Sequence, residues 1–211
     1  VNGLFVVDCV ASGAVWLDMP ELNIDVLLSA PQKGWSATPC AALVMLSERG
    51  RERVESTQST SFACDLRKWL EVMSAYERGG HMYHATLPTD ALAQLRDALV
   101  ESRRSSLSTL RNAQWQLGQR IRATLEGAGF ASVAAEGFEA PSVVVSYTQD
   151  ADVASGKKLR DLGLQVAEGI PLACDEPASF RTFRVGLFGL DKLLNIDRTV
   201  RTFARALEQL R

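Results

Sequence analysis

Residues 22–33 read LNIDVLLSAPQK, in which an apolar run over residues 24–29 ends in a serine and is followed by Ala30, Pro31, Gln32 and Lys33. Similar apolar runs occupy residues 4–8, which end in Asp8, and residues 42–47. Runs of this length, short and nearly continuous, are typical of strands buried on both faces of an α/β sheet. Residues at the carboxyl ends of neighbouring strands in such a sheet face one crevice. We therefore expect Asp8 and Lys33 to meet over one ligand.

An amine and a carboxylate that face the same ligand suit the chemistry of pyridoxal phosphate. The lysine would form a Schiff base with the cofactor, and the acid would keep the pyridinium nitrogen protonated. Lys33 would then serve both as the anchor and as the acid–base catalyst that moves a proton at the substrate α-carbon. Each residue alone is a weak signal, because most lysines and aspartates of a protein are surface groups.

The composition describes an ordinary globular chain of 211 residues, with 46% apolar residues, a net charge of −2 and a pI near 5.8. This charge balance gives no electrostatic reason to expect binding to nucleic acid or to an anionic membrane. No apolar run approaches the roughly 20 residues of a membrane span. The four cysteines show no CxxC spacing, which argues against a zinc site and a disulfide framework. We expect a soluble, cytoplasmic protein, and the abrupt start at Val1 suggests a fragment of a longer chain.

Helical periodicity dominates the middle of the chain. Residues 48–61 are charged and then rich in Ser and Thr, which indicates a helix end followed by a solvated loop. Apolar residues recur at spacings of three and four over 63–76 and predict a helix. A further helix is expected to begin at Pro88 and Thr89. One apolar stripe follows it, and a second begins at Leu107 and continues to Gly127, so we expect a long helical region that bridges two domains.

Strands return after that region. Residues 142–147 and 180–187 predict two strands, with a helix between them that carries Leu159. Asn195 is a suitable cap for a terminal amphipathic helix. We therefore expect an α/β fold followed by a smaller α+β unit.

Several short segments of the sequence together resemble those of the class V, fold type I, pyridoxal-phosphate aminotransferases. These are DCVASG from Asp8 onward, LNIDVLLS over residues 22–29, and the Gln32-Lys33 pair. The branch that they resemble most contains the alanine–glyoxylate and serine–pyruvate aminotransferases. The resemblance covers the whole chain but only the second part of a family chain. It implies a first domain, residues 1–105, that is the later part of the cofactor-binding major domain with a mixed sheet and helices, and a small α+β domain, residues 106–211.

The resemblance also implies roles for individual residues. Gln32 would help to hold the cofactor phosphate, whereas the related cysteine desulfurases commonly carry His before the lysine. Tyr83 and Thr86, in a Tyr-His-x-Thr segment, would contact the phosphate of the partner subunit's cofactor, which makes the homodimer obligatory. Arg184, in an Arg-x-Gly-x-x-Gly segment, would bind the substrate α-carboxylate in a bidentate fork.

The function that this resemblance implies is transfer of an amino group from a small amino acid, such as alanine or serine, to glyoxylate or pyruvate. Two alternatives remain open: another reaction on the same cofactor, namely a lyase, desulfurase or epimerase, or an inactive fragment that acts as a dimerisation module. The histidines at positions 81 and 84 do not make a metal site by themselves, because two ligands do not close one. Trp16 and Trp35 are expected to pack rather than to line the substrate pocket.

Overall fold

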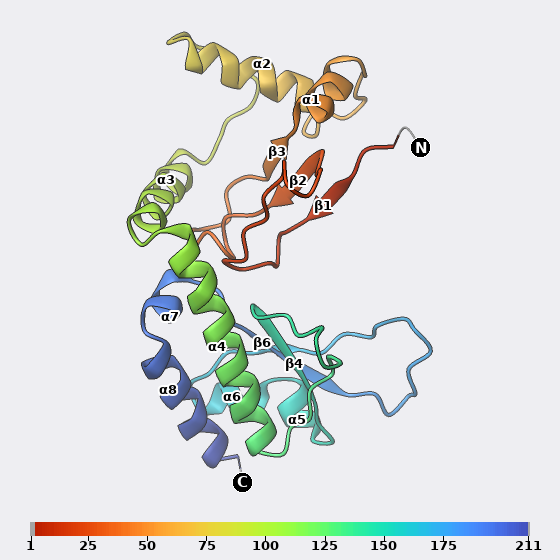
Figure 1. The fold of residues 1–211 in the computed structure, drawn as a ribbon, viewed down its shortest axis with the longest axis vertical. Helices are drawn as coiled ribbons and strands as arrows, with labels where there is room; N and C mark the ends of the chain where they lie inside the picture. The colour runs from red at the N-terminus through yellow and green to blue at the C-terminus, as the bar shows by residue number, and fades with distance from the viewer. Residues whose placement is uncertain (1–2, 211) are drawn as a thin grey trace.

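A computed structural model describes residues 3–210, which form two three-stranded sheets linked and flanked by helices (Figure 1). The first sheet has the order β1-β2-β3, in which β2 pairs in parallel with β1 and antiparallel with β3. The strands are β1 (Val6–Asp8), β2 (Val26–Ser29) and β3 (Leu43–Leu46). Each lies inside one of the apolar runs that predicted it.

The expectation that these strands are buried on both faces is wrong for β1. Phe5 and Val6 are each 53% exposed, because β1 lies at the edge of the sheet and pairs only with β2. β2, the central strand, meets the expectation best, since Val26, Leu27 and Ser29 are buried.

Three helices follow the first sheet. Residues 48–61 contain a complete helix, α1 (Glu48–Glu55), capped by the Ser47 side chain, where only a helix end was expected. α2 (Leu66–Glu77) begins later than the periodicity predicts, because the Asp65 carboxylate accepts a hydrogen bond from the Lys68 N–H and caps it there. α3 (Thr89–Arg104) begins at the predicted residue.

The long helical region consists of two helices. α4 (Leu107–Gly127) is separated from α3 by Ser105 and Ser106, and the φ of Ser106, 61°, lies in the left-handed region. The Ser106 hydroxyl accepts a hydrogen bond from the Thr109 N–H and so caps α4. The boundary expected between residues 105 and 106 stays a prediction; the chain turns from α3 into α4 at this point.

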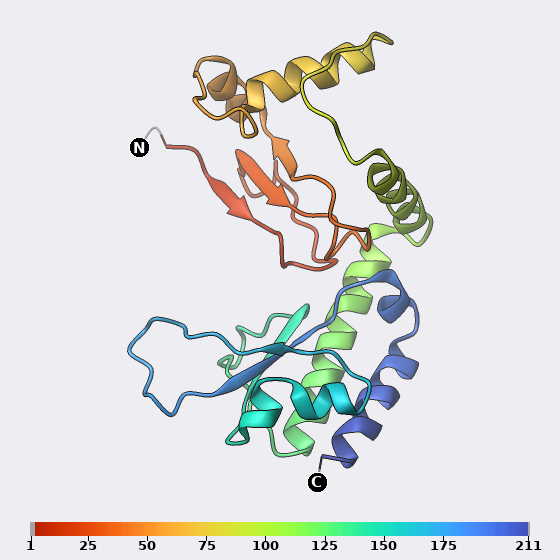
Figure 2. The same ribbon diagram turned by 180° about the vertical axis from the view of Figure 1, so that it is seen from behind.

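The second sheet is antiparallel, with the order β4-β6-β5. Its strands are β4 (Val143–Tyr147), β5 (Ala167–Glu168) and β6 (Thr182–Gly186). Two short helices, α5 (Ala151–Ala154) and α6 (Lys157–Asp161), lie between β4 and β5. Figure 2 shows the long connection from β5 to β6 projecting away from the sheet.

The chain ends in α7 (Leu190–Leu194) and α8 (Ile196–Glu208). Asn195 occupies the N-cap position of α8, as expected, but its side chain makes no capping hydrogen bond. Its amide Nδ2 instead donates to the carbonyl of Asp191 at 3.0 Å, because α7 ends immediately before it and leaves that carbonyl within reach.

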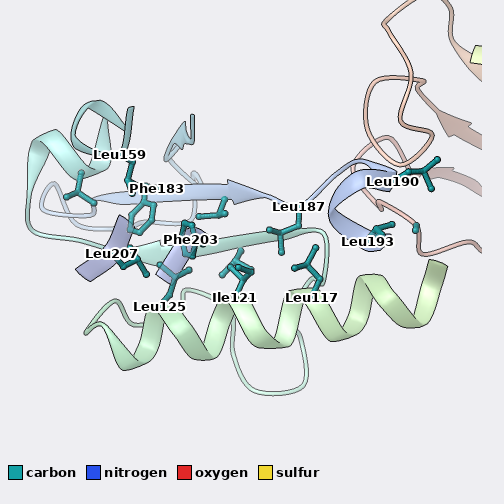
Figure 3. Packing of buried hydrophobic residues seen from close by; sticks show 14 of the residues in the cluster. Leu117, Ile121, Leu125, Leu159, Phe183, Leu187, Leu190, Leu193, Phe203 and Leu207 are labelled. Atoms are coloured by element: carbon teal, nitrogen blue, oxygen red, sulfur yellow. The ribbon is translucent and has the colours of Figure 1, made fainter. Parts of the chain in front are cut away.

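The main core lies between α4, the second sheet and α8 (Figure 3). Leu117, Ile121 and Leu125 form the buried stripe of α4, facing Phe183 of β6 and Phe203 of α8. Ala14 belongs to the same core, although it comes from the segment after β1. A smaller core under the first sheet contains Cys9, Ile24 and Leu27.

Candidate functional site

Asp8 and Lys33 follow the two parallel strands of the first sheet. Val6, Val7 and Asp8 of β1 pair with Val26, Leu27 and Leu28 of β2. Since the strands run in the same direction, the chain leaves both at one edge of the sheet. Asp8 is the last residue of β1, and Lys33 lies four residues beyond the end of β2.

The segment that carries Lys33, residues 31–37, is a closed loop, which we call the lysine loop. The N–H of Ala37 donates to the carbonyl of Pro31 at 3.0 Å, and that of Ser36 donates to the carbonyl of Lys33 at 3.1 Å. The Trp35 indole donates to the Ser29 hydroxyl at 2.9 Å and so ties the loop to the end of β2. The backbone of Lys33 is therefore held by its own loop.

The lysine loop rests directly on the segment that follows β1. A Cβ added to Gly34 would lie 2.0 Å from the carbonyl oxygen of Gly13, so only glycine fits there. Gly13 itself has a φ of 65°. The segments that leave β1 and β2 are thus in backbone contact, which fixes the position of Lys33 relative to the segment that begins at Asp8.

Trp16 and Trp35 pack on each other, as expected, with ring centroids 4.3 Å apart. The Trp16 indole also donates to the carbonyl of Leu107 at the start of α4. The two rings line a cavity of about 220 Å³ together with Cys9, Ser29 and Met45. Neither Asp8 nor Lys33 lines this cavity.

A second set of contacts joins the lysine loop to the segment after β6. The Lys33 ammonium lies over the Phe188 ring, 5.0 Å from its centroid, which is a cation–π distance. The Ser36 hydroxyl accepts a hydrogen bond from the N–H of Leu190 at 2.8 Å. Phe188 lies inside the predicted Arg-x-Gly-x-x-Gly segment and Leu190 immediately follows it, so the fold brings that segment to the lysine.

Arg184 extends from β6 on the side opposite the buried side chains of Phe183 and Val185. Its Nε donates to the carbonyl of Glu168 on β5 at 2.8 Å. The two Nη atoms make no hydrogen bond or ion pair with any residue in the described range 3–210. Arg181 is exposed and donates to the carbonyl of Gln149, away from the site.

The Asp8 carboxylate accepts one local backbone hydrogen bond and forms no ion pair within residues 3–210. Asp8 is exposed and accepts a hydrogen bond from the Val10 N–H at 2.8 Å. Within residues 3–210, neither Asp8 nor Lys33 forms an ion pair. Burial raises the pKa of the neighbouring Cys9 thiol, and the charge of Asp8 adds to that shift. Gln32 is exposed on the lysine loop.

Tyr83 and Thr86 lie together but apart from these residues. Their hydroxyl oxygens are 3.2 Å apart, and Tyr83 is 69% exposed. His84 between them packs against the rings of Phe62 and Trp69, at 4.2 and 5.0 Å between centroids. Within residues 3–210, the hydrogen bonds and ring contacts of this segment are made within the segment itself and with Phe62 and Trp69, at and before the start of α2.

Buried polar contacts connect the two sheets behind the site. The Gln114 amide nitrogen donates to the carbonyls of Pro141 and Leu187, at 2.9 and 3.3 Å, and its oxygen accepts from the Ala14 N–H at 3.3 Å. The Ser142 hydroxyl donates to the carbonyl of Ala11 at 2.7 Å. Sequence reasoning did not single out Gln114, since a polar residue in an amphipathic helix is expected at the surface.

Phe188 and Ser36 were also missed. Phe188 stands within a motif that the sequence reveals, but its apolar side chain gives no sign that it meets a lysine 155 positions away. Ser36 carries no signal of its own, because serine in a short loop is common.

Residues 3–210 contain no group of three or more His, Cys, Asp and Glu side chains arranged to hold a metal ion. In the same range, no helix has the length and apolar character needed to cross a membrane.

No family model matches the sequence. Among curated proteins, the chain is 26% identical over 217 residues to an alanine–glyoxylate aminotransferase of Callithrix jacchus, covering 97% of this chain and 50% of that protein. It is 27% identical over 211 residues to a 2-aminoethylphosphonate–pyruvate transaminase of Burkholderia ambifaria, covering 97% and 54%. The crystal structure of an alanine–glyoxylate aminotransferase from Nostoc superposes with a TM-score of 0.77 at 21% identity, covering 97% of this chain and 54% of that one.

The chain is thus similar to pyridoxal-phosphate aminotransferases of class V, of the alanine–glyoxylate type. It spans about half the length of the curated relatives that it matches. Its two sheets and flanking helices are part of the fold of pyridoxal-phosphate transferases, as the resemblance implies.

Proposed function

We propose that the protein is part of a pyridoxal-phosphate-dependent aminotransferase that moves an amino group from a small amino acid to a 2-oxo acid. The observation that carries the proposal is the arrangement around Lys33. An amine and a carboxylate, neither ion-paired within residues 3–210, follow two adjacent parallel strands, and the Arg184 segment is joined to the lysine loop. The two curated relatives described above are named as an aminotransferase and a transaminase.

The donor set of this chain fits the cofactor. When bound, pyridoxal phosphate supplies an aldehyde that condenses with an amine and a pyridinium ring that stabilises negative charge on the substrate α-carbon. Lys33 would hold the cofactor covalently and, once released, would move a proton to and from the substrate α-carbon. Asp8 would face the ring nitrogen and favour its protonated form. Gln32, which is exposed on the lysine loop, would donate to the phosphate.

Arg184 orients the substrate. Because its Nε is already bonded to the carbonyl of Glu168, the two Nη atoms are the pair that remains for a bidentate contact with the α-carboxylate. A lysine in this place would donate from a single point and could not fix the plane of the carboxylate.

Spectroscopy and covalent trapping test this proposal. The purified protein incubated with pyridoxal phosphate is expected to develop visible absorbance, and borohydride reduction should fix the cofactor on Lys33 as read by peptide mass spectrometry. Lys33→Ala should abolish both signals, whereas Lys157→Ala, which changes an exposed lysine paired with Asp152, should leave both intact. Trapping on other lysines, with Lys33 unmodified, would overturn the proposal.

The substrates are proposed by class: alanine or serine as donor, glyoxylate or pyruvate as acceptor. One relative is named for 2-aminoethylphosphonate, so that donor belongs in the same assay. Incubation with alanine and glyoxylate should yield pyruvate and glycine together. With serine as the donor, release of pyruvate and ammonia without glycine would indicate β-elimination by a lyase instead.

The site is proposed to be shared between two subunits of a homodimer, with Tyr83 and Thr86 serving the partner's cofactor phosphate. Their paired and exposed hydroxyls, which do not contact the lysine loop of their own chain within residues 3–210, support this assignment. A cytoplasmic location remains a prediction from composition.

Mixing two inactive variants tests the shared site. Lys33→Ala protein and a Tyr83→Phe, Thr86→Ala double variant would be unfolded, mixed and refolded together. Mixed dimers would carry one intact site, so about a quarter of the wild-type activity should return if pairing is random. If each chain completes its own site, no activity returns.

A further inference from the structure

Ser36 has an unfavourable backbone conformation, and its side chain makes a contact outside its own loop. Its φ is 60°, in the left-handed region that favours glycine, and it is one of few non-glycine residues there within residues 3–210. A non-glycine residue persists in such a conformation only where surrounding contacts over-determine it. The contact in question is the hydrogen bond from Leu190 to the Ser36 hydroxyl, at 2.8 Å between residues 154 positions apart.

The Leu190 N–H needs this acceptor. Leu190 is the first residue of α7, and the first N–H groups of a helix have no partner within it. The preceding residue is Gly189, which has no side chain to cap the helix. Since Leu190 is buried, its N–H would lack both water and a local cap without Ser36. Ser36 therefore caps α7 from the lysine loop.

The cap lies beside the lysine contact. Lys33 is three residues before Ser36, and Phe188, whose ring it overlies, is two residues before Leu190. Both contacts therefore join the lysine loop to residues 188–190. That segment continues into Leu193, which is buried in the main core, and begins at Arg184 on β6.

We propose that Ser36 is a positioning residue that couples Lys33 to the segment carrying Arg184. The hydroxyl holds the lysine loop against α7, so the amine and the guanidinium occupy set positions relative to each other. The inference rests on the proposed function, in which those two groups act on one substrate, and it deepens that function by naming what sets their spacing. Losing the hydroxyl frees the loop to leave the left-handed conformation and carries the Lys33 amine away from the Phe188 ring.

Three substitutions separate the hydroxyl from the backbone conformation. Ser36→Ala removes the acceptor and keeps the backbone strain, whereas Ser36→Gly removes both. Ser36→Asn supplies a carbonyl acceptor, and Asn tolerates the left-handed region better than other residues with a side chain. Phe188→Leu is the matched change on the other contact, since it removes the ring and leaves the hydroxyl bond.

The first measurement is hydrogen exchange of the Leu190 amide in the purified, folded proteins. Ser36→Ala and Ser36→Gly should each exchange about tenfold faster than wild type, as loss of one hydrogen bond implies. Ser36→Asn should restore protection, and Phe188→Leu should leave it unchanged. Ser36→Gly removes the hydroxyl without adding backbone strain. If its Leu190 amide is as well protected from exchange as in the wild type, the proposal is overturned.

The second measurement follows Lys33 itself. Modification of Lys33 by an amine-reactive label, with Lys157 in the same sample as reference, should change in Ser36→Ala, Ser36→Gly and Phe188→Leu and return to wild type in Ser36→Asn. The rate of borohydride-dependent trapping of pyridoxal phosphate on Lys33 should fall in the same variants. Unchanged labelling and trapping in the variants that lose Leu190 protection would show a cap without coupling and would refute the inference. Wild-type protein that traps no cofactor on Lys33 would instead refute the proposed function. In that case Leu190 amide exchange and Lys33 labelling still test whether Ser36 couples the lysine loop to α7.

Discussion

Replacing Gly34 with alanine should damage both stability and the placement of Lys33. The new Cβ would lie 2.0 Å from the Gly13 carbonyl oxygen and 2.6 Å from its carbonyl carbon. An ordinary carbon–oxygen contact is about 3.3 Å or more, so the two segments must separate by about 1 Å. Both contacts are with backbone. Gly13 has little room to move away, because the Gln114 side chain lies so close that a Cβ built on Gly13 would be 2.5 Å from its oxygen.

The cost follows from that displacement. Overpacking typically costs about 1–3 kcal/mol, and a clash of backbone on both sides puts this one near about 3 kcal/mol. For a chain of this size, that corresponds to a fall in melting temperature of about 6–12 °C. A shift of about 1 Å in a catalytic group can cost about 100-fold in rate, so trapping of pyridoxal phosphate on Lys33 should slow by that order.

Thermal unfolding by circular dichroism and trapping read by mass spectrometry measure the two effects. Gly127→Ala is the matched control, since Gly127 ends α4 and a Cβ there would meet nothing within 4 Å. It should leave trapping unchanged and keep or raise the melting temperature, because glycine in a helix costs about 0.5–1 kcal/mol relative to alanine. A Gly34→Ala protein that melts and traps cofactor like wild type would show that the contact with Gly13 does not place the lysine.

Three further predictions concern the core, the sheet connection and the projecting loop. Phe183→Ala should lower the free energy of unfolding in urea by about 3–5 kcal/mol, because Phe183 is fully buried, whereas Phe138→Ala at a site 85% exposed should change it little. Gln114→Ala should cost about 3 kcal/mol by the same assay, since it leaves buried backbone groups unpaired, and the exposed Gln116→Ala should cost far less. The carboxylate of Glu176 accepts backbone N–H bonds from its own loop, which lowers its pKa to about 2; an NMR titration should find that midpoint rather than one near 4.5. Because the folded-state pKa is depressed, the loop's stabilisation is complete above about pH 4.5 and is lost as the pH falls toward about 2.

Much of the fold follows from local pattern. The apolar runs predict all three strands of the first sheet, and the periodicity of residues 63–76 and 107–127 predicts α2 and α4. Two helix boundaries have local causes that periodicity does not register. Asp65 starts α2 late by capping it, and Ser106 divides the helical region with a left-handed φ. Burial was predicted less well. The exposure of β1 depends on whether another strand pairs with its free edge, and the residues of β1 itself do not reveal that.

The candidate site divides in the same way. The sequence by itself determined that Asp8 and Lys33 follow apolar strands and that Arg184 opens an Arg-x-Gly-x-x-Gly segment, because strand periodicity and short motifs are properties of neighbouring residues. Only the tertiary structure decided that the lysine loop rests on Gly13, that Phe188 lies under the Lys33 amine and that Ser36 caps α7. These contacts join residues 21 to 155 positions apart. They exist because the packing of α4 and α7 on the second sheet carries the end of β6 to the first sheet, and no local pattern encodes such a meeting.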